Sequence, residues 1–208
     1  NTFNELLTTN ADMFEGTTEF QDISREQVVT FDLSGLKAMP NLLNAQIFSV
    51  LSLFSADIVN HGKRCKQTLK ASPYKNEMDM PHYIVNISEA QTLINPKYES
   101  SVKLLADIID SMGENFAGVV LSVNSLRGIL FESGSATFKD PYVTAVQRIF
   151  GLMQYRVFAQ TDDTSVPLLA NALSGSMNQS ELETLPRLRK GQLFMNISSV
   201  GNIVFNQQ

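Results

Sequence analysis

The residues best suited to chemistry lie in one short segment, residues 83–91, with the sequence YIVNISEAQ. Its apolar run ends in Ser88 and Glu89, which is the layout of a Walker B segment. In an open α/β sheet, ligands bind beyond the carboxyl ends of the strands. A carboxylate there, Glu89, can orient a water for attack on a γ-phosphate, while Ser88 stands where an aspartate would help to hold Mg²⁺.

The same segment has a structural alternative. A strand ending in Ser-Glu is a common pattern, and Glu89 could serve only as an acid that caps the following helix. The segment alone therefore leaves both interpretations open, and other features have to decide between them.

Other catalytic constellations are excluded or weak. The two histidines, His61 and His82, lack metal-ligand spacing with Cys65 or with a carboxylate pair, so we expect no metal held by the protein alone. No Gly-x-Ser-x-Gly segment is present, which excludes the common serine hydrolase pattern. Cys65 is the only cysteine, so no disulfide can form within the chain, and we expect a reducing, cytoplasmic setting.

Composition predicts one soluble domain covering residues 1–208. The chain is 43% hydrophobic and 18% charged, with a formal net charge of -5 and a pI near 5.0. This acidity argues against a broad nucleic-acid-binding face, although a narrow pore loop could still touch DNA. No run approaches the roughly 18 apolar residues of a membrane span. The best candidate, residues 47–59, is interrupted by serines and Asp57.

The elements that must position Ser88 and Glu89 follow from periodicity. Short apolar runs alternate with amphipathic helices, which predicts an α/β fold with a mostly parallel sheet flanked by helices. Strands are expected at 27–33, 83–87, 118–123 and 154–160, and a closing pair at 192–197 and 202–205. Helices are expected at 41–60, closed by Gly62, and at 96–112, 142–152, 166–173 and 179–185, with a loop at 63–80.

Several segments, in order, resemble the conjugation ATPases of the FtsK–HerA superfamily. They are MFEGTT at 13–18, VVTFDLS at 28–34, the Walker B-like segment at 83–91, AGVVLSVNS at 117–125, residues 154–165 with their Asp-rich exit, and the closing Ser180-Glu181, Leu185-Pro186, Leu188 and Lys190-Gly191. The resemblance implies a RecA-like, partial P-loop NTPase domain. It also implies ATP and Mg²⁺ as ligands, a hexamer, and partners among secretion-channel proteins at the inner membrane, with DNA as a further candidate. The implied location is cytoplasmic, with peripheral attachment to the cytoplasmic membrane as an option.

The resemblance assigns roles to named residues. Glu89 is the expected catalytic carboxylate, Ser88 adjoins the nucleotide, and Asn124 stands at the γ-phosphate sensor position. A hexameric motor also needs an arginine that reaches a neighbour's γ-phosphate. Arg156 and Arg127 are the candidates, and a structural ion pair is the alternative for each.

The chain departs from the family at several positions. The Walker A sequence is absent, and in the family it would precede residue 1, so ATPase activity is expected only if that part is present. Ser88 replaces an aspartate, Asn124 a glutamine, and Gly113-Glu114 an Arg-Lys pair. Three hypotheses follow: a motor ATPase of a conjugative type IV secretion system, a degenerate oligomeric scaffold of the same apparatus, and a DNA translocase or packaging ATPase.

Overall fold

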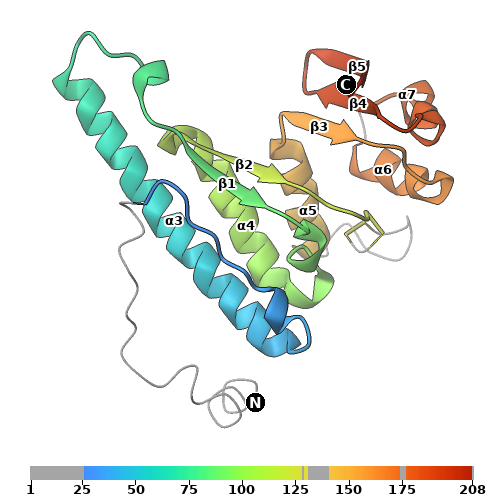
Figure 1. The fold of residues 1–208 in the computed structure, drawn as a ribbon, viewed down its shortest axis with the longest axis horizontal. Helices are drawn as coiled ribbons and strands as arrows, with labels where there is room; N and C mark the ends of the chain where they lie inside the picture. The colour runs from blue at the N-terminus through green and yellow to red at the C-terminus, as the bar shows by residue number, and fades with distance from the viewer. Residues whose placement is uncertain (1–25, 128, 131–140, 174–176, 208) are drawn as a thin grey trace.

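The computed structural model describes residues 26–127, 129–130, 141–173 and 177–207. The segment at 13–18 therefore lies outside the described residues. Helices and strands alternate along the chain (Figure 1) as α3 (Pro40–Ala71), β1 (Tyr83–Ile87), α4 (Glu99–Met112), β2 (Ala117–Leu121), α5 (Pro141–Leu152), β3 (Tyr155–Phe158), α6 (Val166–Ala172), α7 (Gln179–Thr184), β4 (Gln192–Ile197) and β5 (Gly201–Asn206). The α/β class is confirmed.

The parallel part of the fold consists of β1 and β2. They pair in register from Tyr83 opposite Ala117 to Ile87 opposite Leu121, so both strands end at the same edge. One face of the pair, with Val85 buried at 5% exposure, packs against the helices, while Ile84 on the other face is 69% exposed. Helices α3 and α4 lie beside this pair and contact each other (Figure 1).

Helix α3 is longer than the sequence predicted. It runs through Gly62 and the basic segment at 63–71, where a loop was expected. Gly62 is buried, and a Cβ there would lie 2.1 Å from Asn115 Oδ1 and 2.8 Å from Asn115 Cα. The glycine is therefore explained by close packing against the turn after α4 and not by helix termination. Basic side chains such as Lys70 suit the C-terminal end of a helix, where the backbone dipole favours cations.

By length and composition alone, α3 could cross a membrane, which the sequence did not predict. A helix in the core of a soluble protein passes the same test. Here the inner face of α3 is buried in the core at Leu43, Ile47, Leu51 and Ile58. Its opposite face exposes Phe48, at 47%, together with the polar residues Ser49, Ser52, Asn60 and Lys63.

The strand predicted at residues 27–33 is wrong. These residues form an irregular segment that leads into a 3₁₀ turn, Ser34–Leu36. Within the described residues no strand pairs with the segment, and Val28 is 83% exposed. A β-branched run has high strand propensity, but a strand also needs a partner for its backbone groups.

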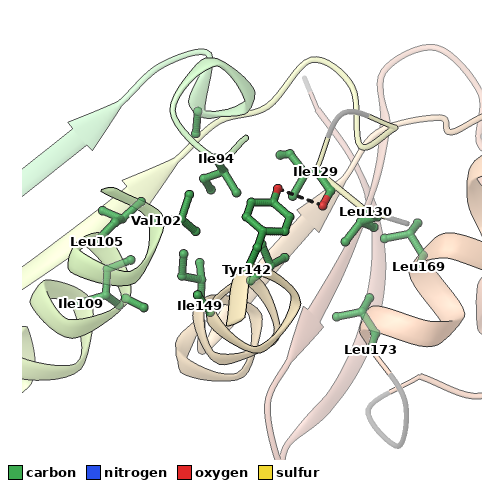
Figure 2. Close-up of a cluster of buried hydrophobic side chains, with 14 of the residues drawn as sticks. Ile94, Val102, Leu105, Ile109, Ile129, Leu130, Tyr142, Ile149, Leu169 and Leu173 are labelled. Atoms are coloured by element: carbon green, nitrogen blue, oxygen red, sulfur yellow. Dashed lines mark hydrogen bonds between the residues drawn. The ribbon is translucent and has the colours of Figure 1, made fainter. Parts of the chain in front are cut away.

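The main core lies between α4, α5 and the segment after β2. Figure 2 shows Tyr142 of α5 standing among Ile94, Val102 and Ile149, with its hydroxyl donating to the carbonyl of Ile129 at 3.2 Å. Leu130, next along the chain, faces Leu169 and Leu173 of the α6 region (Figure 2). The core therefore continues from the parallel pair to the C-terminal part. Arg148 of α5 also pairs with Asp107 and Asp110 of α4.

The remaining three strands form an antiparallel sheet in the order β3-β4-β5. The parallel part is thus smaller than expected, because β3 pairs with β4 in the antiparallel sense. On one face Phe194 and Asn196 are buried. Cross-strand register puts seven apolar side chains on the other face: Tyr155, Val157, Leu193, Met195, Ile197, Ile203 and Phe205. We call these seven residues the apolar sheet face. Tyr155 on it is 61% exposed and Ile203 is 53% exposed.

Candidate functional site

The carboxyl ends of β1 and β2 are tied together by three hydrogen bonds. The Ser122 N–H donates to the Ile87 carbonyl at 3.0 Å, and the Ala90 N–H donates to the Ser122 carbonyl at 2.9 Å. The Asn124 N–H donates to Gln91 Oε1 at 3.2 Å. The segments that carry Glu89 and Asn124, 35 residues apart in the sequence, therefore meet at one edge, where an α/β sheet usually binds its ligand.

Glu89 has an unusual backbone. It lies just beyond β1, after Ser88, and adopts the left-handed conformation, with φ 51° and ψ 43°. Residues other than glycine adopt this region at a cost of order 1–3 kcal/mol, and such residues concentrate at functional sites. The side chain is exposed and its Oε2 lies 2.6 Å from the Nζ of Lys37. The expected helix begins only as a short 3₁₀ turn, Ala90–Thr92, and the Glu89 side chain makes no capping hydrogen bond to it.

Lys37 reaches Glu89 from the end of the turn Ser34–Leu36, which follows the segment predicted to be a strand. Asp32 accepts a hydrogen bond from the Ser34 N–H at 2.9 Å, which starts the turn at 34–36. Hydrogen bonds from Ser34, first from its side chain, lower the pKa of Asp32 below its ordinary value. Leu33 and Leu36 pack against the core, and the turn carries Lys37 to the edge of the parallel pair.

Ser88 is exposed beside Glu89. Among the described residues no group of three or more His, Cys, Asp or Glu side chains could hold a metal ion. Ser88 and Glu89 offer one hydroxyl and one carboxylate. Because Mg²⁺ keeps several waters and is commonly bound through one or two carboxylates and substrate phosphates, this donor set fits Mg²⁺ only when it comes with a nucleotide.

Arg127 follows Asn124 and bonds to the exit of β3. Its guanidinium contacts Asp162 Oδ1 at 2.9 Å and also donates to the Thr164 hydroxyl. Asp162 accepts further bonds from the Ser165 N–H and hydroxyl. Hydrogen bonds from Thr164, Arg127 and Ser165 hold the pKa of Asp162 well below its ordinary range. In this chain, Arg127 thus links the loops after β2 and β3.

Arg156 lies on the buried face of the antiparallel sheet. Its guanidinium donates to the Phe150 carbonyl from two nitrogens, at 3.2 and 2.7 Å, and to Asn196 Oδ1 at 2.5 Å. Asn196 donates to Asn202, which donates to Glu181 of α7. Burial lowers the pKa of Arg156. A role for Arg156 toward a neighbouring subunit would require these bonds to be exchanged.

Cys65 is buried at 4% exposure. Its Sγ lies 3.5 Å from Nε2 of His61, one helical turn earlier on α3. The same Nε2 is 2.9 Å from the Pro81 carbonyl. Cys65 and His61 lie near the start of β1, away from the edge that carries Glu89. These contacts explain both residues as part of the packing of α3, without a functional role.

Sequence reasoning did not single out Lys37, Gln91 or Asp162. Lys37 is 52 residues from Glu89, and nothing in its local sequence indicates the contact. Gln91 belongs to the quoted Walker B-like segment, and Asp162 to the Asp-rich exit of the fourth strand, so their segments were noticed but not their bonds. The expected sensor, Asn124, is brought to the Glu89 edge, whereas Arg156 lies on the other sheet.

No protein-family model matches the chain. An uncharacterized protein of Bacillus anthracis is 27% identical over 205 residues, which are 97% of this chain and 31% of that protein. Among solved structures, VirB4 of Thermoanaerobacter pseudethanolicus has a similar fold, with a TM-score of 0.58 and 16% identity over 86% of this chain and 40% of that chain. At this identity the likeness concerns the fold alone. The chain spans less than half the length of either protein.

Proposed function

We propose that the chain is part of an ATP-hydrolysing domain of a VirB4-like type IV secretion motor, with Glu89 as the carboxylate that orients the attacking water. The observation that carries the proposal is the left-handed Glu89 at the carboxyl end of β1, joined to the Asn124 loop at the end of the parallel neighbour β2. The VirB4-like fold and the ordered resemblance to conjugation ATPases support it.

In this proposal each residue at the edge has a separate task. Glu89 accepts a hydrogen bond from the water and aligns it with the γ-phosphate. Asn124 donates its side-chain amide to a γ-phosphate oxygen, and Gln91 fixes the Asn124 backbone by accepting its N–H. The Ser88 hydroxyl would be available to the water shell of Mg²⁺. Mg²⁺, when bound with ATP, neutralises phosphate charge.

A second candidate, a scaffold that binds its neighbours without turnover, is favoured by specific observations. Ser88 removes a metal-binding carboxylate, and both arginines expected to act on a neighbour are bonded within this chain. Assembly into a hexamer, contact with secretion-channel proteins at the inner membrane, contact with DNA, and a cytoplasmic or peripheral membrane location belong to both candidates as proposals.

The test is ATP hydrolysis by the protein in its full natural length, wild type against Glu89→Gln. Gln keeps the size and hydrogen-bonding length of the side chain and removes the charge. We expect a loss of at least about tenfold in kcat with ATP binding retained, because orientation of the nucleophile is felt mainly in the transition state.

Glu183→Gln is the matched control, because Glu183 is an exposed glutamate on α7, within the described residues but outside the edge. Equal hydrolysis by wild type and Glu89→Gln would remove Glu89 from the mechanism. Tight ATP binding without hydrolysis in the wild type would favour the scaffold.

A further inference from the structure

The ion pair between Lys37 and Glu89 joins two segments that are far apart in the sequence. Its two atoms are 2.6 Å apart, and 52 residues separate them in the sequence. Both side chains are about half exposed, at 53% and 48%. An exposed pair of this kind contributes little to stability, typically about 0–1 kcal/mol, so a contribution to folding does not account well for it.

The backbone around Glu89 is fixed on both sides. Before it, β1 is bonded to β2 through the full register of the pair. After it, Ala90 is fully buried and its N–H bonds to the Ser122 carbonyl. The left-handed conformation of Glu89 therefore sends the side chain out of the sheet in a set direction, and only the side-chain torsions remain free.

The segment that carries Lys37 is fixed as well. Phe31 packs edge-on against Phe54 of α3, with ring centroids 5.5 Å apart. The Met39 N–H donates to the Leu36 carbonyl at 2.9 Å, immediately before α3 begins at Pro40. The backbone of Lys37 is thus held between a closed turn and the start of a long helix, within reach of Glu89.

The contact gives the two carboxylate oxygens of Glu89 different surroundings. The ammonium engages Oε2. The other oxygen, Oε1, is then the one left to accept a hydrogen bond from a water at the sheet edge.

We propose that Lys37 is a positioning residue for Glu89: its ammonium fixes Oε2 so that Oε1 faces the attacking water. The inference rests on the proposed function, since it assigns to Lys37 the alignment of the carboxylate on which hydrolysis depends. Lys37 itself touches neither water nor nucleotide in this role.

The first test does not use ATP. Lysine side chains of the full natural protein are acetylated with a limiting amount of an acetylating reagent. The rate of acetylation at Lys37 is followed by mass spectrometry in the wild type and in Glu89→Gln. An ammonium held by a carboxylate reacts more slowly, so we expect Lys37 to react about threefold faster in Glu89→Gln, while the exposed Lys103 on α4 keeps its rate. Equal rates at Lys37 would overturn the ion pair.

The second test separates positioning from a merely structural role. We expect Lys37→Gln to lower kcat about fivefold with KM for ATP unchanged, because the lost alignment is felt in the transition state and not in ground-state binding. Lys37→Arg keeps the charge and should recover most of the rate. Lys103→Gln, with the same change in net charge, should behave as wild type.

A Lys37→Gln protein with unchanged or higher kcat would overturn the proposal, as would failure of Lys37→Arg to recover more than Lys37→Gln. The roles proposed for Glu89 and for Lys37 can be refuted independently. Hydrolysis that survives Glu89→Gln refutes the proposed function, and hydrolysis that needs Glu89 but is indifferent to Lys37 refutes only this inference.

Discussion

Replacing Gly62 by alanine tests the packing of α3 most directly. An added Cβ would lie 2.1 Å from Oδ1, 2.7 Å from Cγ and 2.8 Å from Cα of Asn115. Favourable contacts between carbon atoms need about 3.5–4.0 Å. The side-chain amide could turn away, but the Cα belongs to the backbone of the turn Gly113–Asn115. Helix α3 and that turn would have to separate by roughly 1 Å.

Two opposing terms set the magnitude. Alanine is a better helix former than glycine, which stabilises the folded state by up to about 1 kcal/mol. Overpacking typically costs about 1–3 kcal/mol, and a clash with backbone belongs at the upper end. The net expectation is a loss of about 2 kcal/mol in the free energy of unfolding.

The assay is thermal and urea unfolding of the protein in its full natural length. Gly151→Ala is the matched control, because Gly151 lies inside α5 and no atom lies within 4 Å of an added Cβ there. That variant should be unchanged or slightly more stable, by up to about 1 kcal/mol. Gly62→Ala with wild-type stability would refute the close packing.

A second substitution separates packing from helix termination. If Asn115 is the obstacle, Asn115→Ala removes two of the three short contacts, and the double variant should lose less than the sum of the single variants. If Gly62 instead served to end the helix, the two positions would act independently, and the effects would add.

Three further outcomes follow from the described contacts. Arg156→Ala should lower the free energy of unfolding by about 1–3 kcal/mol, because it leaves the Phe150 carbonyl without its donor; unchanged stability in urea, with loss of ATP hydrolysis, would instead support a role toward a neighbour. The depressed pKa of Asp162 means that its bonds stabilise the fold above the ordinary value of 3.8, and this contribution is lost as pH falls below it. Asp162→Asn should therefore flatten the decline of stability in acid, and a slope equal to wild type would contradict the bonds. Burial, and then Asp57, raise the pKa of Tyr83 to about 12, so Tyr83→Phe should remove phenolate absorbance from the late part of the titration. Since this folded pKa lies above the ordinary value of 10, the associated stability is complete below pH 10 and is lost as pH rises toward 12.

The periodicity of apolar residues was sufficient to predict the helices and strands that have one clearly buried face. The strand at 83–87 matches the observed bounds, and helix 142–152 differs from α5 by one residue. Gly62 shows where local reasoning failed. Its residue type favours a helix end, but the cause lies in Asn115, which is distant in the sequence and close in space.

Part of the candidate site could be predicted from the sequence and part could not. Parallel pairing follows from the α/β pattern, and because parallel strands end at one edge, the proximity of Glu89 and Asn124 could be predicted. The left-handed backbone of Glu89 and its contact with Lys37 could not. The contact depends on the irregular path of residues 26–39, which ends in the turn Ser34–Leu36. The strong strand propensity of 27–33 predicted a strand there instead.

The apolar sheet face has a consequence for the handling of the protein. Seven apolar side chains on three strands form this surface, and three of them, Tyr155, Val157 and Ile203, are at least half exposed. Such surfaces promote association between molecules, and exposed sheets add backbone groups that can pair. Sulfate strengthens apolar contacts by its exclusion from protein surfaces, whereas low urea weakens them. We therefore expect sulfate to increase self-association through the apolar sheet face and low urea to reduce it.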